Sequence, residues 1–148
     1  MKKIIFGLFA VAALCMTSCK ENVDIVEPGT QTNPEREVAG TYTGTWTRIN
    51  TTDETQEEQD GTVTLTAGDA AYVGSVTVTI PAYSMNSSSV MNVNPTGQFY
   101  NNVVSDNNGL ETAFYGKVTG SDCTMSFRKT ERDGRKTTTF QYNFVGKK

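Results

Sequence analysis

The side chains able to do covalent or acid–base chemistry are few in this chain, which has three cysteines, sixteen acidic residues and no histidine. It therefore lacks the commonest general base and metal ligand, and it has neither a Gly-x-Ser-x-Gly motif nor a phosphate-binding glycine loop. The densest carboxylates lack the ligand spacing of an EF-hand, so we interpret them as a solvated loop between two strands; they are Asp53, Glu54, Glu57, Glu58 and Asp60. The sequence predicts a protein that is not an enzyme and has no cofactor or metal.

Cys19 is the cysteine best placed for chemistry. It follows a basic start and an apolar run over residues 4–14, which has the length of a signal-peptide core and is shorter than the about 20 residues of a membrane span. Two small residues, Thr17 and Ser18, come directly before it. The pattern predicts an exported precursor with residues 1–18 as its signal peptide; an ordinary secretory signal with an incidental cysteine is the alternative.

Met16-Thr17-Ser18-Cys19 resembles the lipobox of bacterial lipoproteins. That resemblance implies cleavage before Cys19, a diacylglycerol on its sulfur and an acyl chain on its amine. Several chains together hold a protein firmly to a membrane, whereas one chain binds marginally. Residues 20–24 (Lys-Glu-Asn-Val-Asp) resemble the surface-export signal of some Gram-negative lipoproteins. We therefore expect a lipid anchor in the outer membrane, with display on the cell surface.

Removal of residues 1–18 leaves 130 residues, a length typical of one domain. Eleven basic residues then face sixteen acidic ones, so no concentrated basic face is expected and nucleic acid is excluded as a partner. Cys123 becomes the one cysteine besides the lipidated residue, so no intrachain disulfide can form. It alternates with Met125 and Phe127, a spacing that predicts a buried thiol. We expect a monomer.

Residues 19–37 contain Pro28, Gly29, Pro34 and many polar residues without apolar periodicity, which predicts a flexible tether. The domain is expected over residues 38–148, where apolar and polar residues alternate with a period of two. About eight strands fit this pattern, separated by turn signals such as Asp-Asn-Asn-Gly at 106–109. The strands are expected near residues 41–48, 63–67, 76–80, 90–93, 99–104, 110–118, 123–128 and 140–144. Residues 83–89 are expected to form a connection at one end of the domain.

Consecutive antiparallel strands leave two exposed sheet edges, and closure into a barrel removes both. The sequence therefore predicts an all-β fold, an up-and-down antiparallel barrel of about eight strands. A β-sandwich is the alternative, because strand spacing alone does not separate the two architectures.

Residues 38–46, with the Gly-x-Trp of Gly44 and Trp46, resemble the opening strand of the calycin-like (lipocalin-like) domains of small bacterial lipoproteins. Residues 114–120 and 140–146 resemble later strands of the same group. The resemblance implies an eight-stranded barrel in which Gly44 and Trp46 form a structural plug at the closed end. In lipocalins a basic residue covers this tryptophan, and the candidates here are Arg128, Arg132 and Arg135.

Large side chains on the alternating positions are expected to face inward, as core or as ligand contacts: Phe114, Phe127, Phe140, Tyr142 and Phe144. An eight-stranded barrel is just wide enough to be filled by side chains or to hold one small ligand. Two functions follow. The first is a membrane-anchored binding module for a small apolar or amphipathic ligand. The second is a solid barrel that acts as a surface interaction or inhibitor protein without a ligand in a cavity.

Overall fold

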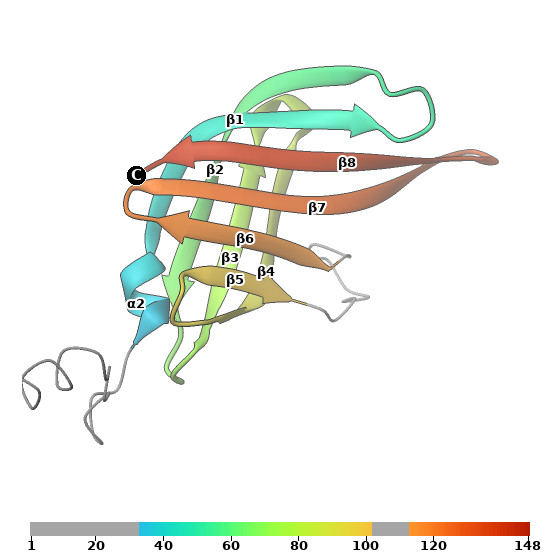
Figure 1. Ribbon diagram of the computed structural model, residues 1–148. Helices are drawn as coiled ribbons and strands as arrows, with labels where there is room; N and C mark the ends of the chain where they lie inside the picture. The colour runs from blue at the N-terminus through green and yellow to red at the C-terminus, as the bar shows by residue number, and fades with distance from the viewer. Residues whose placement is uncertain (1–32, 102–112) are drawn as a thin grey trace, which may run out of the picture. The chain divides into compact units, whose positions relative to one another are not determined.

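The computed structural model describes residues 33–101 and 113–148, which form a closed barrel of eight antiparallel strands in sequence order (Figure 1). The predicted up-and-down barrel is confirmed, and the β-sandwich alternative is wrong because β1 pairs with both β2 and β8. The elements are α2 (Pro34–Val38), β1 (Gly40–Asn50), β2 (Gln56–Ala67), β3 (Val73–Ile80), the 3-10 turn η1 (Pro81–Tyr83), β4 (Met85–Val93), β5 (Gln98–Asn101), β6 (Phe114–Thr119), β7 (Asp122–Asp133) and β8 (Lys136–Lys147).

Alternation along each strand separates the core from solvent. In β3 the even-numbered residues from Gly74 to Ile80 are buried, and the residues between them are partly exposed. In β6 the buried residues Phe114, Gly116 and Val118 alternate with exposed ones. Threonines and serines cover much of the outer face, where their hydroxyls pair across strands, as Thr77 and Ser88 do at 2.8 Å. Such pairs suit β-branched and hydroxyl side chains on a half-buried sheet.

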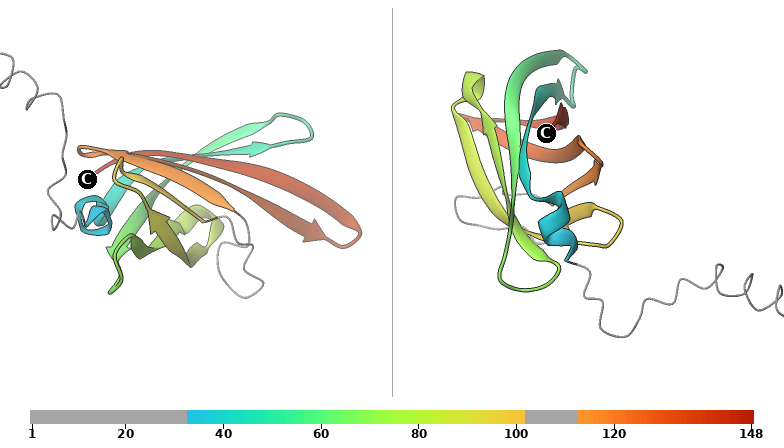
Figure 2. Two further views of the ribbon diagram at one scale, coloured as in Figure 1. Left: turned by 60° about the horizontal axis from the view of Figure 1, so that its bottom comes forward. Right: turned by 90° about the vertical axis from the view of Figure 1, so that its left-hand side faces the viewer.

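Helix α2 covers one end of the barrel, beside the start of β1 (Figure 2). Val38 is buried there, and its carbonyl accepts a hydrogen bond of 2.7 Å from the Tyr42 hydroxyl. Glu35 is also buried, and its carboxylate accepts a 3.0 Å bond from the backbone N–H of Tyr72. The predicted tether over residues 19–37 is therefore wrong at its end, because residues 33–37 belong to the folded unit. Proline in the first turn favours this helix, but five residues are too few to show a helical period. Residues 1–32, including the predicted signal and Cys19, lie outside the described residues.

Two hairpins lengthen the opposite end of the barrel (Figures 1 and 2). The β7–β8 pairing continues to Asp133 and Lys136, whereas the β6–β7 pairing begins at Phe114 and Phe127. The β1–β2 hairpin likewise extends beyond the first pair of β2 with β3. We call these extensions the β1–β2 arm (residues 50–60) and the β7–β8 arm (residues 128–141).

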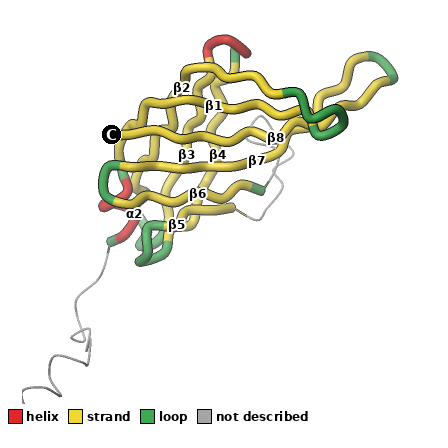
Figure 3. Tube along the Cα trace, turned by 45° about the horizontal axis from the view of Figure 1, so that its top comes forward, coloured by secondary structure: helices red, strands yellow, loops and turns green. Residues whose placement is uncertain are grey.

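Two segments expected as connections belong to strands β2 and β4 (Figure 3). Glu57, Glu58 and Asp60 lie in β2 and not in a loop. The sequence did not indicate this part of β2, because the arm is exposed and carries no apolar alternation. Residues 85–89, expected as a connection, form the first half of β4 and pair with β3. The expected turn at 106–109 and the strand residues beside it fall within 102–112, outside the described residues.

Candidate functional site

The interior of the barrel is occupied by aromatic rings. Trp46 is fully buried, and its ring centroid lies 5.5 Å from that of Phe127 and 5.0 Å from that of Phe144. Phe127 in turn stacks on Tyr142 at 4.8 Å with an angle of 6° between the ring planes. Such contacts add to the stabilisation from burying the rings themselves. These four inward residues form the middle of the core.

Glycines in the wall make room for these rings. A Cβ atom on Gly116 would overlap the ring of Phe99, its register partner on β5, and a Cβ atom on Gly146 would overlap the ring of Phe144. A Cβ atom on Gly61 would lie only 2.7 Å from the Trp46 ring. Large side chains therefore occupy the space that a Cβ atom on each of these glycines would take.

Gly44 and Trp46 have different structural roles within the Gly-x-Trp motif. A Cβ atom on Gly44 would overlap the backbone of β8 at Val145 and Gly146, so this glycine allows the first and last strands to approach closely. Trp46 lies between the rings of Phe127 and Phe144, and the Tyr42 hydroxyl donates to the Val38 carbonyl at the helix end of the barrel. The role of Gly44 and Trp46 as a plug at the closed end stays a prediction.

Arg48 closes the lumen at the arm end. Its side chain is 18% exposed, and its guanidinium carbon lies 3.6 Å from the ring centroid of Phe140 and 4.8 Å from that of Tyr83. One terminal nitrogen donates to Glu131 at 2.8 Å, and the other lies 3.5 Å from Glu57. Burial lowers the pKa of Arg48, but Tyr142 and Glu131 outweigh it, so the net pKa is raised.

The arginine that packs on aromatic rings in the described residues is therefore Arg48 of β1, over Phe140 and Tyr83. The resemblance to lipocalins had pointed to Arg128, Arg132 or Arg135. Arg48 follows Trp46 at the alternating position, so its inward direction was visible in the sequence. Its partners were not, because Glu131 is 83 residues away along the chain.

Cys123 is buried, as predicted. Burial raises the pKa of its thiol from 9.0 to about 12, which leaves the side chain protonated and unreactive at neutral pH. The acidic residues of the β1–β2 arm do not converge either. Asp53 accepts two hydrogen bonds from Thr55, which lower its pKa. Within the described residues, no three metal-binding side chains gather at one point.

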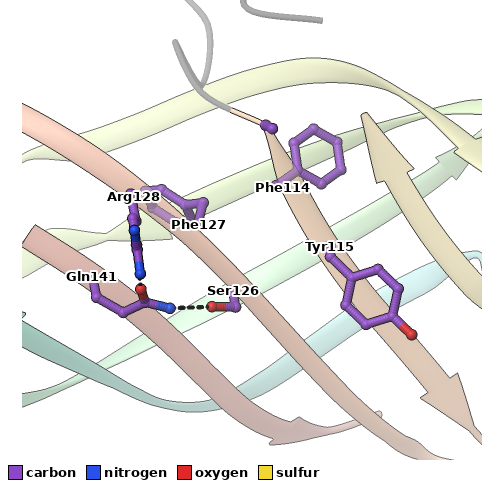
Figure 4. A pocket seen from close by; sticks show the side chains of 7 residues that line it. Phe114, Tyr115, Ser126, Phe127, Arg128 and Gln141 are labelled. Carbon is purple, nitrogen blue, oxygen red and sulfur yellow. Dashed lines mark hydrogen bonds between the residues drawn. The ribbon is translucent and has the colours of Figure 1, made fainter. Parts of the chain in front are cut away.

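An open notch of about 620 Å³ lies beside the start of β6 (Figure 4). β6 begins at Phe114, while β7 and β8 continue past this point. Phe114 and Phe127, two of the predicted ligand-facing residues, border the notch, but their side chains point into the core and are each 3% exposed. Tyr115 is 51% exposed and its hydroxyl accepts a 2.8 Å hydrogen bond from Gln98. We define the notch by its lining residues, Ala113, Phe114, Tyr115, Ser126, Phe127, Arg128 and Gln141.

A chain of hydrogen bonds holds the polar side of the notch (Figure 4). Arg128 donates from Nε to Gln141 Oε1 at 2.8 Å. Gln141 Nε2 donates to Ser126 Oγ at 2.6 Å and to Asn143 Oδ1 at 3.1 Å. Ser126 also donates to Asn143, at 2.8 Å. The sequence analysis missed Gln141 and Ser126, because their approach depends on the register of β7 with β8.

The remaining predicted site residues are separated from the notch. Phe140 lies beneath Arg48, and Tyr142 and Phe144 belong to the filled lumen. The hydroxyl of Tyr142 donates to Glu131 at 3.3 Å, and burial raises its pKa from 10.0 to about 12. Of the five candidate residues, Phe114 and Phe127 border the notch with buried side chains, and the other three do not line it.

Comparisons of the chain with protein-family models, with curated proteins and with solved structures find no match. Within residues 33–101 and 113–148, no helix has the length and apolar character needed to cross a membrane.

Proposed function

We propose that this protein is a lipid-anchored, non-catalytic binding protein of the bacterial outer membrane, which holds a small apolar or amphipathic ligand in the notch. The observation that carries the proposal is the notch, where the exposed ring of Tyr115 adjoins a hydrogen-bonded polar rim. Ligand sites are usually concave and largely apolar with a few placed polar groups, and their volumes run from about 300 to 1,000 Å³.

The filled lumen directs the ligand to the notch. In the lumen, the rings of Trp46, Phe127 and Phe144 already contact one another, and wall glycines receive them. A ligand there would have to displace packed side chains, which costs about 1–3 kcal/mol or more per site. The notch opens to solvent and needs no such displacement.

The anchor is supported by the sequence pattern before Cys19 and is tested by metabolic labelling. Cells are given an alkyne analogue of palmitate, and the chain is isolated and examined for label. We expect label on the wild type and on Cys15→Ser, the matched control, and none on Cys19→Ser. Label that persists on Cys19→Ser would refute the anchor.

The ligand site is tested with the soluble chain of residues 19–148 carrying Cys19→Ser, which keeps the whole barrel and its core. N-phenyl-1-naphthylamine, a neutral probe that fluoresces in apolar sites, is titrated into it. We expect saturable binding that weakens several-fold in Tyr115→Ser, because this change removes an exposed ring from the notch. Val145→Ser, which removes an exposed apolar side chain elsewhere on β8, is the control. Equal binding by all three chains would place the probe outside the notch.

The second candidate, a solid barrel that acts as an interaction or inhibitor protein, is favoured by the two arms. The β1–β2 arm is acidic and the β7–β8 arm is basic, and both are largely exposed. Charged projections of opposite sign steer and orient a protein partner. The charged residues are Asp53, Glu54, Glu57, Glu58 and Asp60 on the first arm and Arg128, Lys129, Arg132, Arg135 and Lys136 on the second, where Glu131 and Asp133 partly offset them. Crosslinking on intact cells, with charge reversal on either arm as control, tests this function.

A further inference from the structure

We infer that the ligand of the notch is an organic anion: an apolar or aromatic group that carries a carboxylate, sulfonate or phosphate held by Arg128. This inference rests on the proposed function, because it assigns a chemical class to the same site. It follows from how the guanidinium of Arg128 is held and from what surrounds it.

Arg128 is held by its inner nitrogen. Its Nε donates to Gln141 Oε1 at 2.8 Å, and the amide nitrogen of Gln141 is itself bound by Ser126 and Asn143. These two bonds orient the Gln141 carbonyl toward Arg128. A long exposed side chain is thereby restricted before any ligand arrives, which lowers the entropy that binding must overcome.

Among the residues that the structure describes, no carboxylate lies within 4 Å of the Arg128 nitrogens, since the ion pairs there are made by Arg48 and Lys147. Glu131, the acidic residue nearest along β7, is bound by Arg48 and by Tyr142. The planar guanidinium therefore keeps donors for an anion, and such forks bind carboxylate, sulfonate or phosphate oxygens in pairs.

An exposed ring lies on the same outer face as this charge. Tyr115 is the register partner of Ser126, which stands two residues before Arg128 on β7, and its side chain is 51% exposed (Figure 4). A ligand with a ring against this surface would bring a substituent to Arg128, so charge and apolar contact would act together.

Two probes that share one ring system separate the charge from the apolar contact. N-phenyl-1-naphthylamine is neutral, and 1-anilinonaphthalene-8-sulfonate is the same amine with a sulfonate. Both are titrated into the soluble chain of residues 19–148 with Cys19→Ser. We expect the sulfonate to bind about tenfold more tightly, since a charge-assisted hydrogen bond to a fixed guanidinium corresponds to about that factor.

Variants assign the difference to Arg128. Arg128→Gln is expected to abolish the preference for the sulfonate and to leave the neutral probe unchanged. Arg132→Gln removes the same charge from the outer face of β7, outside the notch, and is expected to keep the preference. Gln141→Ala is expected to reduce the preference in part, because Arg128 remains but loses its orienting partner. Unchanged thermal melting shows that each variant is folded.

The outcomes distinguish the two proposals. Equal binding of both probes, or an equal loss of preference in Arg128→Gln and Arg132→Gln, would overturn the inference that the ligand is an anion. The notch would then be a site for neutral apolar ligands. Binding of neither probe would overturn both the inference of an anionic ligand and the proposed function. Tighter binding of the sulfonate that depends on Arg128 alone would establish both.

Discussion

The lumen and the notch are built from the same kinds of side chain and differ in what faces those side chains. In the lumen, Phe144 lies against Trp46 and over Gly146, so its surface is covered by protein. At the notch, the ring of Tyr115 is 51% exposed beside an open volume of about 620 Å³. An eight-stranded barrel is wide enough for a ligand or for side chains. In the described part of this protein, aromatic side chains occupy the lumen, and the notch lies on the wall outside it.

The notch lies at a step between the described strands. β7 and β8 each span 12 residues, whereas β6 spans six. The pairing of β6 with β7 begins at Phe114 and Phe127, so β7 beyond Phe127 has only β8 as its described partner. A barrel with aromatic rings in its lumen can therefore still offer a site on its outer wall.

The largest effect is expected from Trp46→Ala, which empties the centre of the lumen. Loss of a fully buried tryptophan removes apolar contact and leaves a cavity, so the free energy of unfolding should fall by about 3–5 kcal/mol. Urea denaturation of the soluble chain measures this loss. Trp46→Phe keeps part of the contact and should cost less. A loss below about 1 kcal/mol for Trp46→Ala would contradict a filled lumen.

Gly116→Ala is expected to destabilise the barrel by overpacking. Its Cβ atom would overlap the Phe99 ring, and such insertions cost about 1–3 kcal/mol. The double variant with Phe99→Leu removes the overlapped ring and should recover part of the loss relative to Phe99→Leu alone. Thermal or urea unfolding of the four chains gives the coupling energy. Simple additivity of the two changes would argue against the contact.

Alkaline pH should lower the free energy of unfolding of the barrel, whereas neutral pH should leave it unchanged. Burial holds the thiol of Cys123 protonated in the folded state up to about pH 12, but the unfolded chain loses that proton near pH 9.0. Above pH 9 the unfolded state therefore binds fewer protons, and the free energy of unfolding should decrease as pH rises toward 12. Tyr142 acts in the same direction above pH 10.0. Denaturation between pH 7 and 11 should show a shallower decline in Cys123→Ala than in the parent chain.

The smallest effect on stability is expected at the notch. Arg128→Gln removes an exposed side chain with one hydrogen bond to Gln141, so the free energy of unfolding should change by less than about 0.5 kcal/mol. Calorimetry beside Trp46→Ala gives the contrast. A loss as large as that of a lumen residue would show that Arg128 stabilises the fold, and would contradict the difference between lumen and notch.

Much of the barrel was predictable because alternation is a local property. In residues 76–80 and 140–144, apolar residues at every second position indicate strands, and the structure places strands there. Helix α2 was missed because one turn shows no period. The start of β2 was missed because the arm carries polar residues on both faces. Local patterns therefore predict elements that border the core and fail where an element leaves it.

The sequence by itself determined the all-β class, the inward faces of the strands and the burial of Cys123, because each depends on neighbouring residues. Tertiary structure decided which residues meet across the barrel. The pairing of Arg48 with Glu131, the fit of Phe99 over Gly116 and the chain from Arg128 through Gln141 to Ser126 all join separate strands. Register and strand length set these contacts, and a one-residue shift in register would turn the same side chains to opposite faces. For this reason, the candidate site emerged from the folded barrel.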